Sequence, residues 1–177
     1  QTRSKTSSLL KKKEFLDFIF NNYNKEQIQP EEILSYIYAI LYSKNYRNTY
    51  QNFLKTDFPR IPFVDNYKIF IQLSKLGSKL IELHLMKIKF DRFVAKFNIP
   101  DSNLVKFVKY ENKKVKINDK QYFDNVPKDT WDFYIGGYQV LDKWLRDRKN
   151  KKLSHREIEK YIEIINILKE TIDIMEK

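Results

Sequence analysis

Few residues of this chain have types and spacing that could support catalysis. A Pro100-Asp101 pair followed by Glu111-Asn112-Lys113 matches the order of a nuclease site, in which two carboxylates and a lysine gather around a divalent cation. That chemistry requires the three side chains to converge from the ends of adjacent core strands. Residues 111–113 instead lie in a polar stretch whose residue types are ordinary turn formers. The sequence therefore argues against a nuclease site.

Metal-binding and nucleophilic sites find as little support. His84 and His155 are the only histidines, and each falls at the end of a predicted helix without a second ligand spaced beside it. The chain has no cysteine, which excludes a disulfide framework and thiolate metal ligands and fits a reducing cytoplasm. We therefore expect no catalytic residue and no metal ligand in this chain.

The glycine pair Gly136-Gly137 holds two of the three glycines of the chain. Adjacent glycines reach positive φ and let another group approach the backbone closely. The lysine and hydroxyl residue of a phosphate-binding loop do not follow the pair, and a helical pattern with Leu141 and Trp144 begins instead. We predict that the pair is a turn or packing device and not a ligand site.

The charge balance of the chain favours a polyanionic partner. Thirty-four basic and 23 acidic side chains give a formal net charge of +11. Nucleic acid is the first candidate and an anionic membrane surface the second, although a lysine-rich proteome also produces basic proteins. No apolar run approaches the roughly 20 residues of a membrane span, and no signal peptide is recognisable.

The candidate DNA-binding residues lie in three places. Lysines crowd a predicted β-ribbon, where they could follow phosphates while Asn112 and Asn118 reach base edges, but a solvated sheet face explains them equally well. Basic residues near 146–152 follow a helix end, where the helix dipole accounts for part of the pattern. Two arginines in the N-terminal half suit phosphate or guanine, or could pair with a carboxylate such as Asp57. The candidates are Arg47, Arg60, Lys109, Asn112, Lys113, Lys114, Lys116, Lys120, Arg146 and Arg148.

Hydrophobic periodicity predicts helices over most of the chain. The first covers residues 9–23, Pro30 opens the second, and a third begins near Asn45. Prolines predict an extended connector at 58–62 before a long helix that Asp65 caps and that ends near Met86. Gly77 lies inside this helix and predicts close packing against another helix.

The spacing of hydrophobic residues changes twice in the C-terminal half of the chain. Alternating residues predict a three-stranded antiparallel meander, followed by a short helix after Pro127. Ser154 and Glu157 form a capping box that opens the final helix. The buried seam predicted for that helix consists of Ile158, Tyr161, Ile165, Leu168, Ile172 and Met175.

The expected fold is therefore mainly α with a small antiparallel β-meander, an α+β arrangement in which a helical bundle carries a β-hairpin insert. Residues 1–8 are expected to be disordered or a linker. One recognition domain would then comprise a helical part at 9–100, the meander at 101–126, and the Gly-Gly turn with the C-terminal helices at 127–177.

Several blocks of the sequence occur in the order of one known family. They are Tyr42–Arg47, Phe53–Pro62, Leu76-Gly77, Leu83–Leu85, Val115–Asn118, Tyr122-Phe123, Ile135–Leu145 and Leu153-Ser154. Together they resemble the C-terminal specificity region of type ISP restriction–modification enzymes, over about residues 30–177. The loop Lys149–Lys152 departs from the glycine-containing loop of that family.

The resemblance implies a function for the chain. Enzymes of this family join a nuclease, a helicase-like ATPase, an adenine-N6 methyltransferase and a target-recognition domain, and the chain resembles the last of these. It would be a sequence-specific duplex DNA-binding module, without catalytic activity, in the bacterial cytoplasm. S-adenosylmethionine, ATP and Mg²⁺ would serve the parent enzyme, whose methyltransferase domain would be a second partner. The alternative is a helical scaffold that docks an upstream recognition element onto that domain and contacts DNA little.

Overall fold

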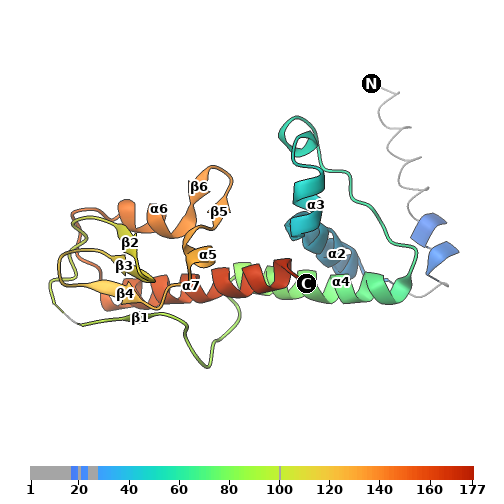
Figure 1. The fold of residues 1–177 in the computed structure, drawn as a ribbon. Coiled ribbons are helices and arrows are strands. Elements are labelled where there is room, and N and C mark those ends of the chain that lie inside the picture. The colour runs from blue at the N-terminus through green and yellow to red at the C-terminus, as the bar shows by residue number, and fades with distance from the viewer. Residues whose placement is uncertain (1–16, 20, 24–27, 100) are drawn as a thin grey trace, which may run out of the picture. The chain divides into compact units, whose positions relative to one another are not determined.

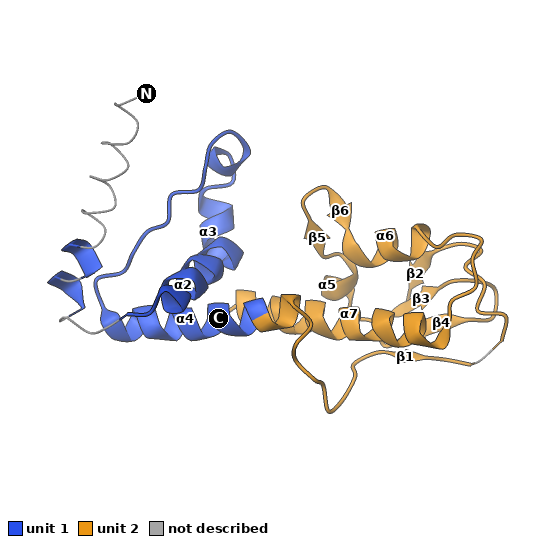
Figure 2. Cartoon of the chain, turned by 180° about the vertical axis from the view of Figure 1, so that it is seen from behind, with its two compact units in different colours: residues 1–81 blue, residues 82–177 orange. Residues whose placement is uncertain are grey.

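The computed structural model describes residues 17–19, 21–23, 28–99 and 101–177, and the chain forms two compact units within it. The N-terminal unit spans residues 1–81 and the C-terminal unit residues 82–177 (Figure 2). The predicted linker at 1–8 and most of the first predicted helix lie outside the described residues. Helices and a small antiparallel sheet confirm the expected α+β class (Figure 1).

The N-terminal unit is helical. It contains α2 (Pro30–Tyr42), α3 (Lys44–Thr49), the 3-10 turn η1 (Phe53–Lys55) and most of α4 (Tyr67–His84). The predicted third helix is therefore shorter than expected, because the chain turns after Thr49 and forms η1 separately. Asn66, and not the predicted Asp65, caps α4, since its Oδ1 accepts from the backbone N–H groups of Lys68 and Ile69.

Gly77 confirms the predicted close packing of two helices. A Cβ atom at this position would lie 1.7 Å from the carbonyl oxygen of Ser35 in α2. The buried face of α2 is centred on Ser35, Tyr36 and Ala39, while Ile33 and Ile40 of the predicted stripe pack at its margin. The missing side chain thus lets α4 approach the backbone of α2.

Tyrosine side chains hold the extended connector of the N-terminal unit. The hydroxyls of Tyr46, Tyr36 and Tyr23 donate to the carbonyl oxygens of residues 60, 62 and 64, at 2.8, 2.7 and 2.5 Å. A connector with two prolines cannot satisfy its own carbonyls by helical hydrogen bonds. Burial raises the pKa of Tyr23 to about 12, so this donor stays protonated at physiological pH.

The C-terminal unit contains a four-stranded antiparallel sheet in the order β1-β4-β3-β2. The strands are β1 (Lys96–Phe97), β2 (Lys109–Glu111), β3 (Lys114–Lys116) and β4 (Tyr122–Asp124). Strands β2, β3 and β4 confirm the predicted meander. Strand β1 was not predicted, because two residues are too few to show an alternating pattern.

Three helices and a hairpin complete this unit. They are α5 (Lys128–Trp131), the hairpin β5 (Tyr134–Ile135) and β6 (Tyr138–Gln139), α6 (Val140–Arg146) and α7 (His155–Met175). Gly136-Gly137 forms the two-residue loop of the hairpin, with Gly136 at φ +58°, so the pair is a turn device as predicted. No group lies within 4 Å of a Cβ built at either glycine, which rules out a packing role.

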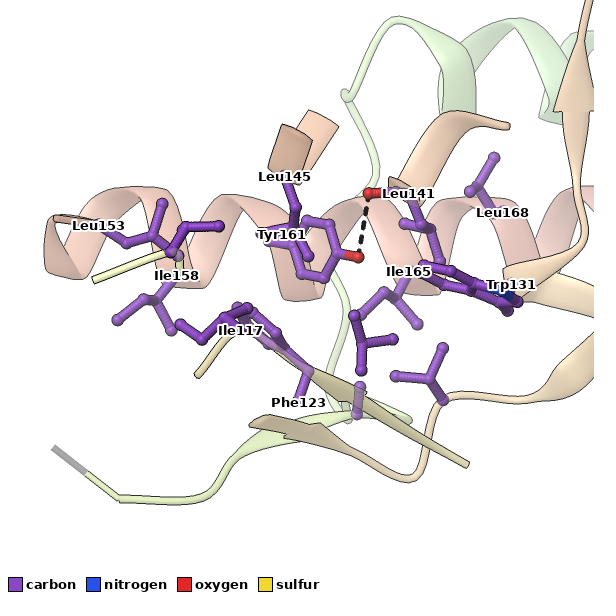
Figure 3. Close-up of a cluster of buried hydrophobic side chains, with 14 residues drawn as sticks. Ile117, Phe123, Trp131, Leu141, Leu145, Leu153, Ile158, Tyr161, Ile165 and Leu168 are labelled. Carbon is purple, nitrogen blue, oxygen red and sulfur yellow. Dashed lines mark hydrogen bonds between the residues drawn. The ribbon is translucent and has the colours of Figure 1, made fainter. Parts of the chain in front are cut away.

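The core of the C-terminal unit lies between the sheet and α7. Figure 3 shows the Tyr161 ring among Phe123, Ile117 and Leu145, with its hydroxyl donating to the Leu141 carbonyl at 3.2 Å. The Ser154–Glu157 capping box confirms the predicted start of α7. The first four seam positions are buried as predicted, but further along Thr171 and Ile174 replace Ile172 and Met175. An α-helix of 3.6 residues per turn drifts away from a strict seven-residue repeat in this way.

Candidate nucleic-acid interface

The sheet of the C-terminal unit has one buried face and one open face. Tyr110, Val115 and Phe123 lie opposite one another in neighbouring strands and point toward the core. Side chains alternate along a strand, so the adjacent row of Lys109, Lys116 and Tyr122 lies on the open face. Glu111 and Lys114 form a second open pair. The strand register therefore places three of the predicted lysines, Lys109, Lys114 and Lys116, on one face of the sheet.

The turn between β2 and β3 projects two polar side chains. Asn112 and Lys113 are both exposed and adopt positive φ angles of 51° and 61°. Such angles at both central residues match the right-handed twist of a two-residue hairpin. The carbonyl of Lys113 accepts from the backbone N–H of Val126 at 2.8 Å, which anchors the base of the turn. A positive φ favours glycine or asparagine, so Lys113 adopts this backbone conformation at some cost in free energy.

The charges of the β2–β3 hairpin are unequal. Its eight residues, 109–116, include four lysines and one carboxylate, Glu111. Glu111 Oε2 lies 2.8 Å from Lys116 Nζ and 3.4 Å from Lys109 Nζ. The hydrogen bond from Lys116, together with the charge of Lys109, lowers the pKa of the Glu111 carboxyl. Lys114 Nζ lies 4.4 Å from the centre of the Tyr122 ring, a cation–π contact.

A shallow hollow of about 360 Å³ lies on this open face. It is lined by Glu111, Asn112, Lys114, Lys116, Asn118, Asp119 and Tyr122. Lys106 and Lys120 lie nearby, each within 4 Å of a carboxylate, Asp119 and Asp101 respectively. The hollow therefore combines two lysines, the carboxylates of Glu111 and Asp119, and an aromatic ring.

Asn118 does not reach a base edge as the sequence suggested. It is 5% exposed, and its amide donates to the Leu104 carbonyl and to Gln121 Oε1, both at 3.0 Å. Gln121 is fully buried and also donates to Asn103 Oδ1 at 2.8 Å. This network fixes the loop between β3 and β4, because buried amides need partners for every polar atom. The sequence did not indicate that Asn103 and Gln121 belong to this network, because isolated amide residues are also common in loops.

Arg47 and Arg60 belong to the N-terminal unit. Arg47 Nε donates to the Leu41 carbonyl at 2.6 Å, and its guanidinium carbon lies 4.7 Å from the centre of the Tyr42 ring. Arg60 is exposed in the connector, 5.4 Å from the centre of the Phe53 ring. Arg60 therefore presents its guanidinium to solvent, whereas Arg47 also holds the end of α2.

Arg146 ends α6 in the C-terminal unit, and Arg148 follows it. Arg146 pairs with Asp142 at 2.5 Å within the same helix. Arg148 lies 3.0 Å from Glu157, donates to the Trp144 carbonyl at 2.9 Å and stacks 3.4 Å from the centre of the Trp144 ring. These contacts fix the start of α7 against α6. The backbone N–H and hydroxyl of Ser154, and then Arg148, lower the pKa of Glu157.

The histidines have structural partners. His84 Nε2 lies 3.0 Å from Thr171 Oγ1, and His155 Nε2 lies 3.3 Å from Glu159 one turn along α7. Within the described parts of the chain, no three His, Cys, Asp or Glu side chains gather where a metal ion could be held. In the same residues no helix is long and apolar enough to cross a bilayer. Glu111 of the nuclease-like pattern lies at the hairpin turn, as expected, and Pro100 lies outside the described residues.

The family of the chain is identified by a match to a known protein family. Residues 4–177 match the family described as the Type ISP C-terminal specificity domain. This chain belongs to that family. A specificity domain is a recognition module and not a catalytic domain, which confirms the expectation that this chain is not itself an enzyme. No curated protein matches the chain.

Solved structures share the fold of this specificity domain. It is similar to the Type ISP restriction–modification enzyme LlaGI in complex with a DNA substrate mimic (21% identity, TM-score 0.65) and to the ATP-dependent Type ISP enzyme LlaBIII bound to DNA (18%, 0.66). A DrdV–DNA complex gives 20% identity and a TM-score of 0.72. These matches cover 86, 87 and 91% of this chain, which spans 14, 11 and 19% of the three longer chains.

Proposed function

We propose that this specificity domain binds duplex DNA and recognises a short sequence for a bacterial restriction–modification enzyme. The observation that carries the proposal is the β2–β3 hairpin, where two exposed lysines (Lys109 and Lys113) and two half-buried ones (Lys114 and Lys116) lie beside a hollow lined by polar side chains. Support comes from the family, which is a specificity domain, and from three proteins of the same fold that were solved with DNA.

The hairpin suits the major groove of duplex DNA. A two-stranded β-ribbon fits that groove, whose base edges carry a distinct pattern of donors and acceptors. Lys109, Lys113 and Lys114 would contact phosphates and set the register of the ribbon. Asn112 at the turn and Lys116 in the hollow would face base edges. Lys120, Arg60 and Arg146 would add phosphate contacts, whereas Arg47 and Arg148 mainly position their own elements.

The test is binding of duplex DNA by the full chain across a salt series. We expect affinity that falls steeply with salt, because phosphate contacts release counterions. Reversal of Lys113, Lys114 and Lys116 to glutamate should weaken binding by at least tenfold at low salt. The matched control reverses Lys55, Lys68 and Lys75, three exposed lysines of the N-terminal unit, and changes net charge by the same amount. Absent binding, or affinity indifferent to salt, would contradict the proposal.

One observation favours the scaffold alternative. The β5–β6 hairpin exposes Tyr134, Ile135 and Tyr138, at 55, 51 and 64%. Nearby cations are paired with carboxylates, for example Lys143 with Asp147 at 2.8 Å, so this surface offers little positive charge to DNA. It could instead contact protein. If the domain is only a scaffold, reversal of the three hairpin lysines leaves the DNA affinity of the parent enzyme unchanged.

The remaining parts of the proposal concern the parent polypeptide. We infer that it is an ATP-dependent adenine-N6 methyltransferase and nuclease of the bacterial cytoplasm, and that its methyltransferase domain contacts this module. S-adenosylmethionine, ATP and Mg²⁺ would bind to other domains of that polypeptide. Methylation of duplex DNA by the intact enzyme, measured with and without each of these cofactors, tests this assignment.

A further inference from the structure

We propose that Glu111 and Lys116 form a subsite that reads one C·G base pair. Glu111 would accept a hydrogen bond from the cytosine amino group, and Lys116 would donate to guanine O6. The inference rests on the proposed function, since it assumes that the open face of the hairpin lies in the major groove. Glu111 would then determine specificity, although its negative charge by itself argues against a place in a DNA interface.

The first argument is the placement of a carboxylate among lysines. A carboxylate on a face that binds phosphates opposes that binding, and exposed ion pairs contribute little to stability. Glu111 nevertheless lies in the hollow, 41% exposed, between Lys109 and Lys116. Both ion pairs are made by Oε2, which leaves Oε1 outside them. The carboxylate is thus ionised and held in place, with one oxygen directed to neither lysine.

The second argument is the spacing of the donor and the acceptor. Lys116 Nζ donates to Glu111 Oε2 at 2.8 Å, so the ammonium donor lies beside the carboxylate whose Oε1 would accept from cytosine. In a C·G pair the cytosine N4 donates to guanine O6 at about the same distance, within the ordinary range of N–H···O bonds. Both atoms also face the major groove, N4 as a donor and O6 as an acceptor. An acceptor–donor pair on the protein therefore matches a donor–acceptor pair on the DNA.

The third argument separates C·G from A·T. An A·T pair also presents an amino group beside a carbonyl, but thymine O4 is flanked by a methyl group. Guanine O6 is flanked by N7, which is a second acceptor for an ammonium group. Carboxylates are suited to the cytosine amino group and lysines to guanine, so both side chains favour the same pair. Lys114 lies over the Tyr122 ring, 4.4 Å from its centre, and both residues line the hollow together with Lys116.

The experiment is selection of bound duplexes from a randomised library by the full chain. The informative variant exchanges the two groups, Glu111→Lys with Lys116→Glu, which keeps the net charge and the ion pair. We expect a consensus with a C·G pair that changes to G·C in the exchanged variant, while other positions stay the same. Glu111→Gln should reduce discrimination at that position alone, by about tenfold to a hundredfold. The control exchanges Lys143 of α6 and Asp147, the residue that follows this helix, which form an exposed ion pair.

The outcomes separate this inference from the proposed function. A consensus that the exchange leaves unchanged, or a uniform loss of affinity at every sequence, overturns the C·G subsite and leaves DNA recognition standing. Failure of the unmodified chain to select any sequence overturns both. Thermal unfolding of the exchanged variant, compared with the unmodified chain, identifies a variant that has lost its fold, and Glu111→Gln then decides the matter because it keeps the shape of the side chain.

Discussion

Single side chains divide into those that hold the fold and those that face outward. Asn118 and Arg148 look like DNA-binding residues in the sequence, yet their polar atoms are engaged by neighbouring backbone and side-chain groups. Lys113 has the opposite character, since its side chain is exposed at a backbone position that disfavours lysine. A residue kept at positive φ against its preference is a candidate for function.

Replacing Lys113 with glycine should separate stability from binding. The substitution relieves the positive φ of 61°, so we expect the free energy of unfolding to rise by about 0.5 kcal/mol. DNA affinity should fall, because one phosphate contact is lost. Urea unfolding and a binding titration on the same sample measure the two effects. A loss of stability would show that the lysine side chain itself supports the turn.

Glu157 should make part of the stability depend on pH. Its pKa is lowered below the ordinary value of 4.5, chiefly by the Ser154 backbone N–H. A group whose pKa is lowered on folding contributes stability above its unfolded pKa and loses it as pH falls through the folded pKa. Glu157→Gln keeps the capping box but not the charge. The variant should therefore be less stable than the unmodified chain at pH 7, and the difference in the free energy of unfolding should shrink as pH falls below 4.5 and through the lowered pKa of Glu157.

Pairs of elements depend on contacts that a single residue can break. Helices α2 and α4 approach at Gly77, the connector is held by three tyrosine hydroxyls, and the capping box joins α7 to the loop before it. For Gly77 the signal was visible in the sequence, but its partner, Ser35 of α2, was not. For the capping box both Ser154 and Glu157 were visible, because they lie three residues apart.

Gly77→Ala should destabilise the N-terminal unit although alanine favours helices. The new Cβ would lie 1.7 Å from the Ser35 carbonyl oxygen and 2.6 Å from its carbon, so the two helices must move apart. Overpacking of this kind costs about 1–3 kcal/mol, more than the gain of about 1 kcal/mol in helix propensity. Ser78→Ala, at the next and exposed position, is the control and should change stability little. Equal effects of the two substitutions in urea unfolding would contradict the close contact.

At the scale of the whole molecule, the net charge does not show where the positive charge of the chain lies. The chain carries +11, but many lysines and arginines of the C-terminal unit are paired with carboxylates one turn away, as in Lys128–Asp132 and Lys160–Glu163. The β2–β3 hairpin has four lysines against one carboxylate. Net charge is therefore a poor measure of how strongly the domain binds a polyanion.

The salt dependence of DNA binding should reflect this concentration. If Lys109, Lys113, Lys114, Lys120, Arg60 and Arg146 each neutralise one phosphate while Lys116 faces a base, the logarithm of affinity falls with the logarithm of salt with a slope of about −5. A slope near −10 would mean that cations throughout the chain contribute, and would contradict an interface centred on the hairpin. The measurement is a titration of one duplex at several salt concentrations.

Periodic and local signals made most of the elements predictable. The meander, the extended connector, the capping box and the glycine turn follow from hydrophobic spacing and from residues with strong backbone preferences, which act over a few neighbours. Strand β1, the η1 turn and the Asn66 cap were not predicted, because two or three residues carry no period. The lysines of the candidate interface were visible, but Tyr122 and the role of Glu111 were not.

The sequence by itself determined the class of fold, the family and the polyanionic preference, since these depend on composition, spacing and ordered blocks of residues. Only the tertiary structure decided which cations are available. Strand pairing places Lys109 beside Lys116 and brings Glu111 within reach of both, whereas burial removes Asn118 from the surface. The physical reason is that strand register and burial depend on how side chains are placed in three dimensions, which a linear pattern of residues does not specify.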